Sequence, residues 1–136
     1  MHDTVLVVDD DANARIIAET LLRVRGLHVR STGDPAEAPA LIDDPDVAVV
    51  VLDLGASALN GVDMLHRLRN HPETSAHVIA ITDRTEPEVE RFAERMGADA
   101  FLRKPLQPAA FINLVEQLLG TPVARTNARS QSPKRP

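Results

Sequence analysis

The sequence predicts an α/β fold in which one five-stranded parallel sheet carries helices on both faces. Five short apolar or β-branched segments alternate with five segments whose apolar residues recur at helical spacing. One of these strands, VAVVVLDL at 47–54, is apolar almost throughout, which is typical of a strand covered on both faces. Parallel neighbours need crossover connections, and the intervening helices supply them.

The first half of the chain predicts two strand and helix pairs before that central strand. The first strand is expected at 5–8, and the helix after it is expected to end at Gly26. A second strand at 27–31 is followed by a short helix over 36–42, with Asp34 as its N-cap. The inward face of the first helix is assigned by its helical spacing to Ile16, Ile17, Thr20, Leu21 and Val24.

The second half repeats the alternation. The expected elements are a helix over 61–69, a strand at 77–82, a helix from Pro87 to Gly97, a strand at 98–102 and a helix from Pro108. The side chains expected to face inward from these helices are Val62, Leu65, Leu68, Val89, Phe92, Ala93, Met96, Phe111, Leu114, Val115 and Leu118.

Composition and charge divide the chain into a folded unit at 1–119 and a tail at 120–136, which we expect to be a disordered basic tail or linker. All twenty Asp and Glu residues lie in the first part with eleven Lys and Arg, so its net charge is −9, whereas the tail carries four basic residues and no acid. The acidic unit argues against direct nucleic-acid binding by the folded domain. The five histidines are expected to lie on the surface.

The sequence has neither the basic start of a signal peptide nor an apolar run long enough to cross a bilayer. We therefore expect the protein to be cytoplasmic and not to associate with a membrane. The absence of cysteine excludes disulfides and thiolate metal sites and is compatible with a reducing compartment.

Charged and hydroxyl side chains stand at the expected carboxyl ends of four strands: Asp9, Asp10, Asp53, Thr82 and Lys104. If strands one, three, four and five lie side by side, these side chains meet at one edge of the sheet, where ligands bind in such folds. Three carboxylates facing one ammonium group are unfavourable unless a cation joins them. Oxygen ligands of this kind favour Mg²⁺, with Mn²⁺ as a second choice.

Four sequence motifs carry a resemblance to a known family: VLVVDDD at 5–11, VVVLDLGASALNG at 49–61, VIAIT at 78–82 and FLRKP at 101–105. In this order and at these separations, the chain from residue 4 to about 119 resembles a receiver domain of a bacterial two-component response regulator. The resemblance implies a flavodoxin-like, doubly wound sheet with strand order 2-1-3-4-5 and five helices. It also implies a sensor histidine kinase or phosphotransfer protein as partner.

The resemblance also implies roles for individual residues. Asp53 corresponds to the aspartate that accepts a phosphoryl group and also helps to hold the metal ion. Asp10 corresponds to the direct carboxylate ligand of Mg²⁺, Asp9 to a ligand that often acts through water, and Gly55 to the position whose backbone carbonyl binds the ion. Such a domain accepts phosphate and can dephosphorylate itself, but it is not a turnover enzyme.

The resemblance assigns the response to phosphorylation to three further residues. Thr82 corresponds to the hydroxyl that bonds a phosphoryl oxygen, and Lys104 to the cation that pairs with it. Phe101 corresponds to the aromatic residue that changes rotamer on activation, and the peptide bond between Lys104 and Pro105 is usually cis in the family. The switched face is expected to comprise the last two helices and the fifth strand. It would control an output domain or partner, with phosphorylation-driven homodimerisation left open.

Three residues depart from the family pattern. Ser57 stands where a proline is usual, and Asp83 stands after Thr82 where a small residue is usual. A carboxylate at Asp83 would repel a phosphodonor if it faces the site. Gly55 gives little side-chain cover to Asp53, so we expect easier water entry and a shorter-lived phosphoryl group.

Two other functions are each suggested by part of the sequence. A phosphorylation-independent interaction module of the same fold is opposed by the retained acids, hydroxyl and lysine, and mildly favoured by Asp83. A small Mg²⁺-dependent phosphohydrolase is suggested by the Asp-x-Asp pair of Asp9 and Asp11, as in haloacid-dehalogenase-like enzymes, but the chain has no room for their cap domain. We expect Asp11 to be a helix N-cap instead.

Overall fold

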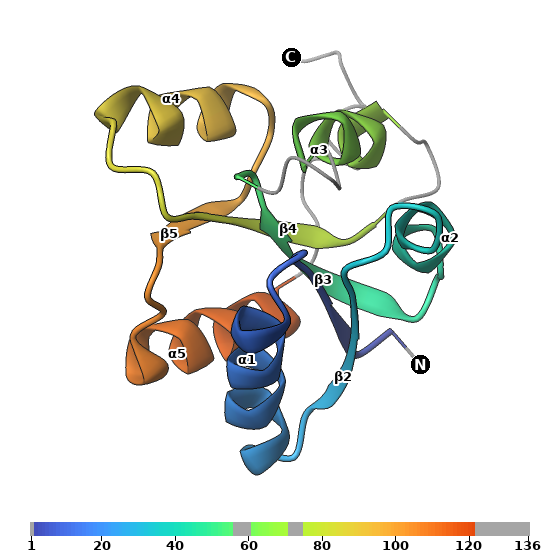
Figure 1. Ribbon diagram of the computed structural model, residues 1–136. Coiled ribbons are helices and arrows are strands. Elements are labelled where there is room, and N and C mark those ends of the chain that lie inside the picture. The colour runs from blue at the N-terminus through green and yellow to red at the C-terminus, as the bar shows by residue number, and fades with distance from the viewer. Residues whose placement is uncertain (1, 56–60, 71–74, 122–136) are drawn as a thin grey trace.

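The protein is described by a computed structural model in which residues 2–55, 61–70 and 75–121 are placed (Figure 1). Its five parallel strands have the order β2-β1-β3-β4-β5. They are β1 (Thr4–Val8), β2 (His28–Thr32), β3 (Val47–Asp53), β4 (His77–Thr82) and β5 (Ala100–Arg103). The helices of this part of the chain are α1 (Ala12–Val24), α2 (Ala38–Ile42), α3 (Gly61–Asn70), α4 (Pro87–Arg95) and α5 (Pro108–Leu119). The predicted fold class and strand order are confirmed.

The sheet separates two apolar cores. Helices α1 and α5 cover one face, and α2, α3 and α4 lie on the other (Figure 1). From Val49 onward, alternate residues of β3 enter opposite cores, so Val49 and Val51 face α1 and α5, whereas Val50 and Leu52 face the other side. All seven residues of β3 are buried, which confirms the central strand predicted from its uninterrupted apolar run.

The predicted inward face of α1 is wrong for most of its residues, although Leu21 does pack against the core. Ile16, Ile17 and Val24 are 59%, 54% and 79% exposed, while the helix buries Ala18 and Leu22 against the sheet. The helix has apolar residues on more than one side, so spacing alone admits two inward faces. In the structure the inward face is the one that carries the small Ala18, where the helix packs against the sheet.

Helix boundaries differ from prediction mainly at α2. Asp34 accepts a hydrogen bond from the Ala36 N–H at 2.9 Å, but it closes a turn, and the helix itself begins at Ala38. Pro39 in the first turn fits that short helix because no intrahelical bond is required of its nitrogen there. The strand expected at 98–102 lies instead at β5, two residues further along at its start.

Not every histidine lies on the surface, contrary to prediction. His77, the first residue of β4, is 5% exposed. Its Nε2 lies 2.7 Å from the carbonyl oxygen of Thr121, which can only accept a hydrogen bond, so the ring nitrogen donates. Gly120, the C-cap of α5, and Thr121 are the described residues of the predicted tail, and residues 122–136 lie outside the described part of the chain.

Candidate functional site

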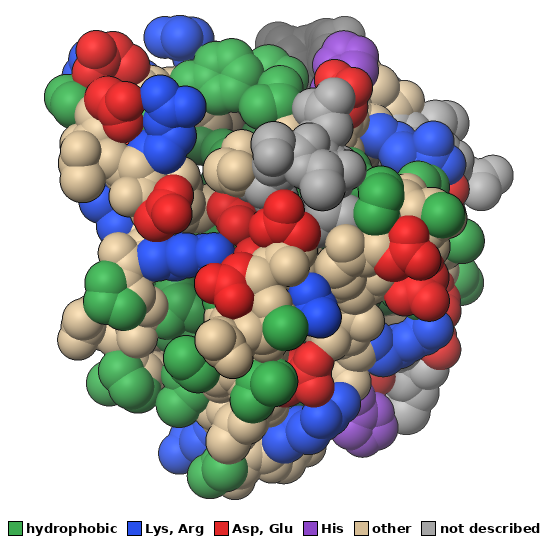
Figure 2. All heavy atoms as spheres, in the orientation of Figure 1, with side chains coloured by type: hydrophobic (Ala, Val, Ile, Leu, Met, Phe, Trp, Pro, Cys, Tyr) green, Lys and Arg blue, Asp and Glu red, His purple; other side chains and the backbone are tan. Residues whose placement is uncertain are grey.

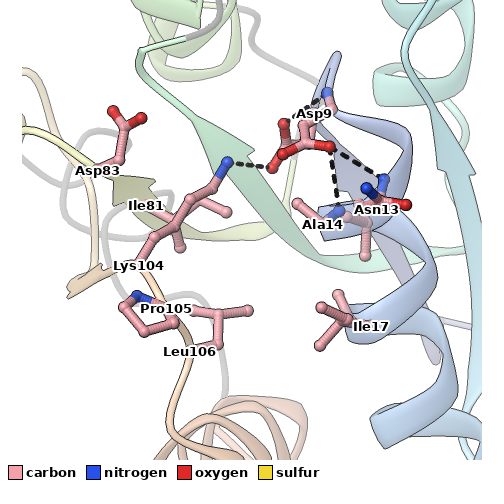
Figure 3. A pocket seen from close by; sticks show the side chains of 12 residues that line it. Asp9, Asn13, Ala14, Ile17, Ile81, Asp83, Lys104, Pro105 and Leu106 are labelled. Atoms are coloured by element: carbon pink, nitrogen blue, oxygen red, sulfur yellow. Dashed lines mark hydrogen bonds and ion pairs between the residues drawn. The ribbon is translucent and has the colours of Figure 1, made fainter.

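Two buried aspartates and one lysine meet at the carboxyl edge of the sheet. Asp9 directly follows β1 and is 1% exposed, and Asp53 is the last residue of neighbouring β3 and is 5% exposed. Lys104, just after β5, places its Nζ 2.7 Å from Asp9 Oδ2 and 3.1 Å from Asp53 Oδ2. Figure 3 shows this side chain crossing toward Asp9. The predicted convergence of strand ends is therefore observed.

The loop after β1 is held by contacts that sequence reasoning missed. Asp9 Oδ1 accepts the Asp11 N–H at 3.0 Å, and the Asp9 carbonyl accepts Arg15 Nη1 at 2.7 Å. The guanidinium occupies space that a side chain at Gly33 would fill, because a Cβ there would lie 2.1 Å from Arg15 Nη1. An arginine one turn into α1 and a glycine after β2 are not a recognisable pair in sequence, since only the fold brings them together.

The electrostatics of the site are dominated by burial and by excess negative charge. Burial first, and the neighbouring Asp9 second, raise the pKa of Asp53 from 3.8 to about 6. The Gly55 N–H, which donates to Asp53 Oδ1 at 2.8 Å, and Lys104 act in the opposite direction. Partial burial lowers the pKa of Lys104, but its bonds to Asp9 and Asp53 outweigh this and raise it.

A third acid completes a group that could hold a metal ion. Carboxylate oxygens of Asp9, Asp10 and Asp53 lie within 4.8 Å of one another, and Asp10 is exposed. Three carboxylates and one ammonium group leave an excess of negative charge in a partly buried position. A hard divalent cation such as Mg²⁺ prefers carboxylate oxygens together with water, so this donor set fits the predicted ion.

Asp11 does not join the three acids. Its Oδ1 accepts the N–H groups of Asn13 at 3.0 Å and Ala14 at 3.4 Å, and the residue is the N-cap of α1. The predicted N-cap is confirmed. The second aspartate of the Asp-x-Asp pair is thus engaged in starting the helix, which gives the phosphohydrolase reading no support.

Thr82 borders the site from β4 and is fully buried. Its hydroxyl accepts the Arg84 N–H at 3.1 Å, and its carbonyl accepts the Lys104 N–H at 2.7 Å. The peptide bond between Lys104 and Pro105 is cis, as predicted. Phe101 is half-buried on β5, where the Arg103 guanidinium stands 5.1 Å from its ring centroid.

The space over Asp53 is bordered by Gly55 and Asp83. A Cβ at Gly55 would lie 3.3 Å from Asp53 Oδ1, 3.4 Å from Asp83 Oδ1 and 3.6 Å from Thr82 Oγ1. The Asp83 carboxylate therefore faces the same space as Asp53, although the residue is exposed. Ser57, the third predicted departure, lies outside the described residues.

A cavity of about 350 Å³ opens beside the acids, between α1 and the loop that joins β5 to α5 (Figure 3). Asp9, Asp83 and Lys104 form its polar side, and Ile17 and Leu106 contribute apolar surface. Figure 2 shows acidic side chains gathered beside a basic one near the middle of this face. The cavity next to the acids is thus lined partly by polar and partly by apolar side chains.

Comparison with known proteins identifies the class to which this fold and site belong. The family model of the response regulator receiver domain matches residues 5–116, so the chain belongs to the receiver domains of response regulators. The resemblance inferred from the four motifs is confirmed.

Individual relatives agree with this family. An uncharacterized 14.6 kDa protein of Leptolyngbya boryana is 30% identical over 83% of this chain and 87% of its own length. The DNA-binding response regulator MtrA of Mycobacterium tuberculosis is 28% identical over 88% of this chain, which spans about half (51%) of MtrA. The crystal structure of the NtrX receiver domain from Brucella abortus has a TM-score of 0.76 at 31% identity, covering 86% of this chain and 98% of that one. Among the described residues, no helix is long and apolar enough to span a membrane.

Proposed function

We propose that the chain is a phosphoacceptor of a two-component phosphorelay, in which Asp53 receives a phosphoryl group from a histidine kinase or phosphotransfer protein. The observation that carries the proposal is the contact of Lys104 Nζ with both Asp53 and Asp9 at the edge of the sheet. A buried aspartate next to a second acid is costly unless the site binds a charged ligand that uses both.

The chemistry needs positioning and charge neutralisation more than covalent assistance. An Asp53 carboxylate oxygen attacks the phosphorus of a phosphohistidine on the partner, a new P–O bond forms, the P–N bond breaks, and the imidazole leaves. Lys104 neutralises charge on the transferred group, and the Gly55 N–H orients the Asp53 carboxylate. A bound Mg²⁺ would supply further neutralisation of the phosphoryl oxygens.

The same residues would hold that ion. Asp10 is exposed and within reach of the two buried acids, so it is assigned as a direct ligand, with Asp9 acting directly or through water. Asp53 and the Gly55 carbonyl complete the protein ligands in this proposal. Mn²⁺ would be accepted by the same oxygen donors.

Phosphorylation would then change the surface formed by α4, β5 and α5. The acyl phosphate adds charge and strong acceptors close to Thr82, whose hydroxyl is drawn toward them. Because Thr82 directly precedes the loop before α4, its displacement alters that loop and the environment of the Phe101 side chain. The altered surface would bind an output partner, an attached domain or a second copy of the chain.

The proposal is tested by incubating the protein with Mg²⁺ and a small phosphodonor such as acetyl phosphate, followed by intact mass measurement. One added phosphoryl group is expected for the wild type and none for Asp53→Asn. The matched control is Asp11→Asn, which keeps an N-cap side chain on α1 and should be phosphorylated like the wild type. Equal labelling of Asp53→Asn would refute the assignment.

One observation favours a second candidate, a receiver-fold module that acts without phosphorylation. The Asp83 carboxylate faces the space over Asp53, where it would repel an incoming phosphodonor. If this repulsion dominates, Asp83→Ala should be labelled by acetyl phosphate while the wild type is not. Labelling of the wild type itself would remove this candidate.

A further inference from the structure

We propose that Arg103 is a positioning residue that holds the loop between β4 and α4 in its present conformation and thereby sets how readily Phe101 responds to the site. The inference rests on the proposed function for its consequence, but the contact itself is independent of that function. Neither the motifs nor the family resemblance singled out Arg103.

Arg103 binds the backbone of this loop at two points. Its Nη1 donates to the carbonyl oxygen of Arg84, and its Nη2 lies 3.4 Å from the carbonyl oxygen of Glu86. The planar guanidinium fork suits two acceptors that lie two residues apart, and a lysine could not bind both with fixed geometry. The loop is therefore attached to the edge strand β5 through a single side chain.

The same guanidinium also contacts the ring of Phe101. It stands 5.1 Å from the ring centroid, within the range of a cation–π interaction. Alternate residues of a strand face the same side of the sheet, so the two side chains are neighbours by register. A change of the Phe101 rotamer would remove this contact, and a movement of Arg103 would release the ring.

The loop that Arg103 binds is also hydrogen-bonded to Thr82 of the site. The Arg84 N–H donates to the Thr82 hydroxyl at 3.1 Å, while the Arg84 carbonyl accepts from Arg103. A Thr82 hydroxyl that moves to bond a phosphoryl oxygen withdraws from the Arg84 N–H. The displaced loop would then lose its bonds to Arg103, and the guanidinium would leave the Phe101 ring.

The loop also contains an ion pair of its own, which cannot replace Arg103. Arg84 and Glu86 form an ion pair at 2.9 Å, and this pair lowers the pKa of Glu86 to about 2. Both side chains are well exposed, so the pair is screened by solvent, and it joins the loop only to itself. Arg103 is the side chain that fixes the loop to the sheet within the described part of the chain.

The experiment uses the full chain labelled with fluorophenylalanine, because the sequence has only three phenylalanines and no tyrosine or tryptophan. The ¹⁹F spectrum should contain one resonance each from Phe92, Phe101 and Phe111, and Phe101→Leu identifies the second. Spectra are recorded for the wild type, Arg103→Ala, Arg103→Lys and the exposed α4 control Arg91→Ala. Each is then titrated with beryllofluoride and Mg²⁺ as an acyl-phosphate mimic.

Without beryllofluoride, the Phe101 resonance of Arg103→Ala should move toward the position that the wild type reaches with it, while the Phe111 resonance stays. Arg103→Lys should lie between the two, because it keeps a cation but loses the fork. The beryllofluoride midpoint should fall about threefold to tenfold in Arg103→Ala, as expected for the loss of bonds that favour one of two states. Arg91→Ala should match the wild type.

A Phe101 resonance and a beryllofluoride midpoint in Arg103→Ala equal to those of the wild type would overturn the inference. A wild type whose spectrum ignores beryllofluoride would instead contradict the proposed function. In that case, a ligand-free Phe101 resonance of Arg103→Ala equal to that of the wild type would overturn the contact role of Arg103, and a shifted one would support it. Should Arg103→Ala fail to fold, Arg103→Gln keeps the stem and one amide donor, and the same two outcomes apply to it.

Discussion

The two edges of the sheet each carry a buried polar cluster, and they differ in charge balance. At the carboxyl edge, Asp9 and Asp53 share one cation, Lys104, with Asp10 close by. The acids therefore outnumber the base. At the opposite edge, where the strands begin (the amino edge), the buried ring of His77 donates a hydrogen bond to a backbone carbonyl. Asp99 lies on the other side of the ring, with His77 Nδ1 3.7 Å from Asp99 Oδ2.

The amino-edge cluster is occupied with holding the fold together. Asp99 Oδ2 accepts the Val78 N–H at 2.7 Å, and Arg69 Nη2 donates to the Ala76 carbonyl at 3.1 Å. These bonds join the end of α3, the start of β4 and the turn before β5, while His77 adds the segment after α5 through Thr121. The two clusters show two uses of buried polar groups. Groups paired with backbone partners stabilise the fold, whereas a cluster with excess negative charge can bind a ligand of opposite charge.

Removal of the cation that Asp9 and Asp53 share should have the largest effect. Lys104→Met leaves two buried carboxylates without a cationic partner, and we expect labelling by acetyl phosphate to slow about a hundredfold or more. The rate of phosphoryl incorporation measured by mass spectrometry checks this. Lys104→Arg keeps the charge and should retain part of the rate, and a Lys104→Met rate within a few-fold of the wild type would contradict the proposed role.

The corresponding change at the amino edge should alter stability but not labelling. His77→Ala removes a buried hydrogen bond and leaves a cavity, so we expect a loss of about 2 kcal/mol in the free energy of unfolding. Urea denaturation provides the measurement. The exposed His66→Ala on α3 is the control and should stay within about 0.5 kcal/mol of the wild type. Slower phosphoryl incorporation in folded His77→Ala would contradict the assignment of a purely structural role to the amino-edge cluster.

The contact of Arg15 with the Asp9 carbonyl, which supports the carboxyl edge, can be disrupted by a substitution at Gly33, directly after β2. A side chain at Gly33 would displace the Arg15 guanidinium from the Asp9 carbonyl, so Gly33→Ala should cost about 1 to 2 kcal/mol of stability and weaken Mg²⁺ binding. Thermal unfolding with and without Mg²⁺ measures both. Gly120→Ala is the matched control, because a Cβ there meets its nearest neighbour at 3.7 Å, an ordinary contact. Equal behaviour of the two variants would show that Arg15 is dispensable.

The burial of Asp53, together with the neighbouring Asp9, should also appear as a pH dependence of stability. Because the pKa of Asp53 rises from 3.8 to about 6, the folded state binds more protons than the unfolded state between these values. In metal-free buffer, Asp53 should therefore lower the free energy of unfolding as the pH rises through this window, and Mg²⁺ should offset the loss at pH 7. Denaturation of wild type and Asp53→Asn across this range checks the sign, since their difference should grow with pH.

The smallest expected effect concerns the cover over Asp53. Asp83→Ala removes a charge from the space beside Asp53, and Gly55→Glu fills that space, so each should change the lifetime of the phosphoryl group by only a few-fold. Loss of radiolabelled phosphate after removal of the donor measures it. We expect Gly55→Glu to retain phosphate longer because water is excluded from Asp53. Unchanged lifetimes in both variants would show that neither position controls water entry.

The sequence by itself determined the order of elements, the parallel sheet and the convergence of Asp9, Asp53, Thr82 and Lys104. The order of elements and the parallel sheet follow from local periodicity. The convergence also required strands one, three, four and five to lie side by side, an order that the family resemblance implied. The four motifs then pointed to the receiver family, which the match over residues 5–116 confirms.

The tertiary structure alone decided which side of each element is covered and by what. Ile16, Ile17 and Val24 share helical spacing with buried neighbours but stay exposed, and His77 became buried because Asp99 and Thr121 lie against it. The contacts of Arg15 with Gly33 and of Arg103 with the loop before α4 likewise join separate elements. Periodicity describes a segment alone, whereas burial and hydrogen bonding depend on the partner surface that packing brings to it.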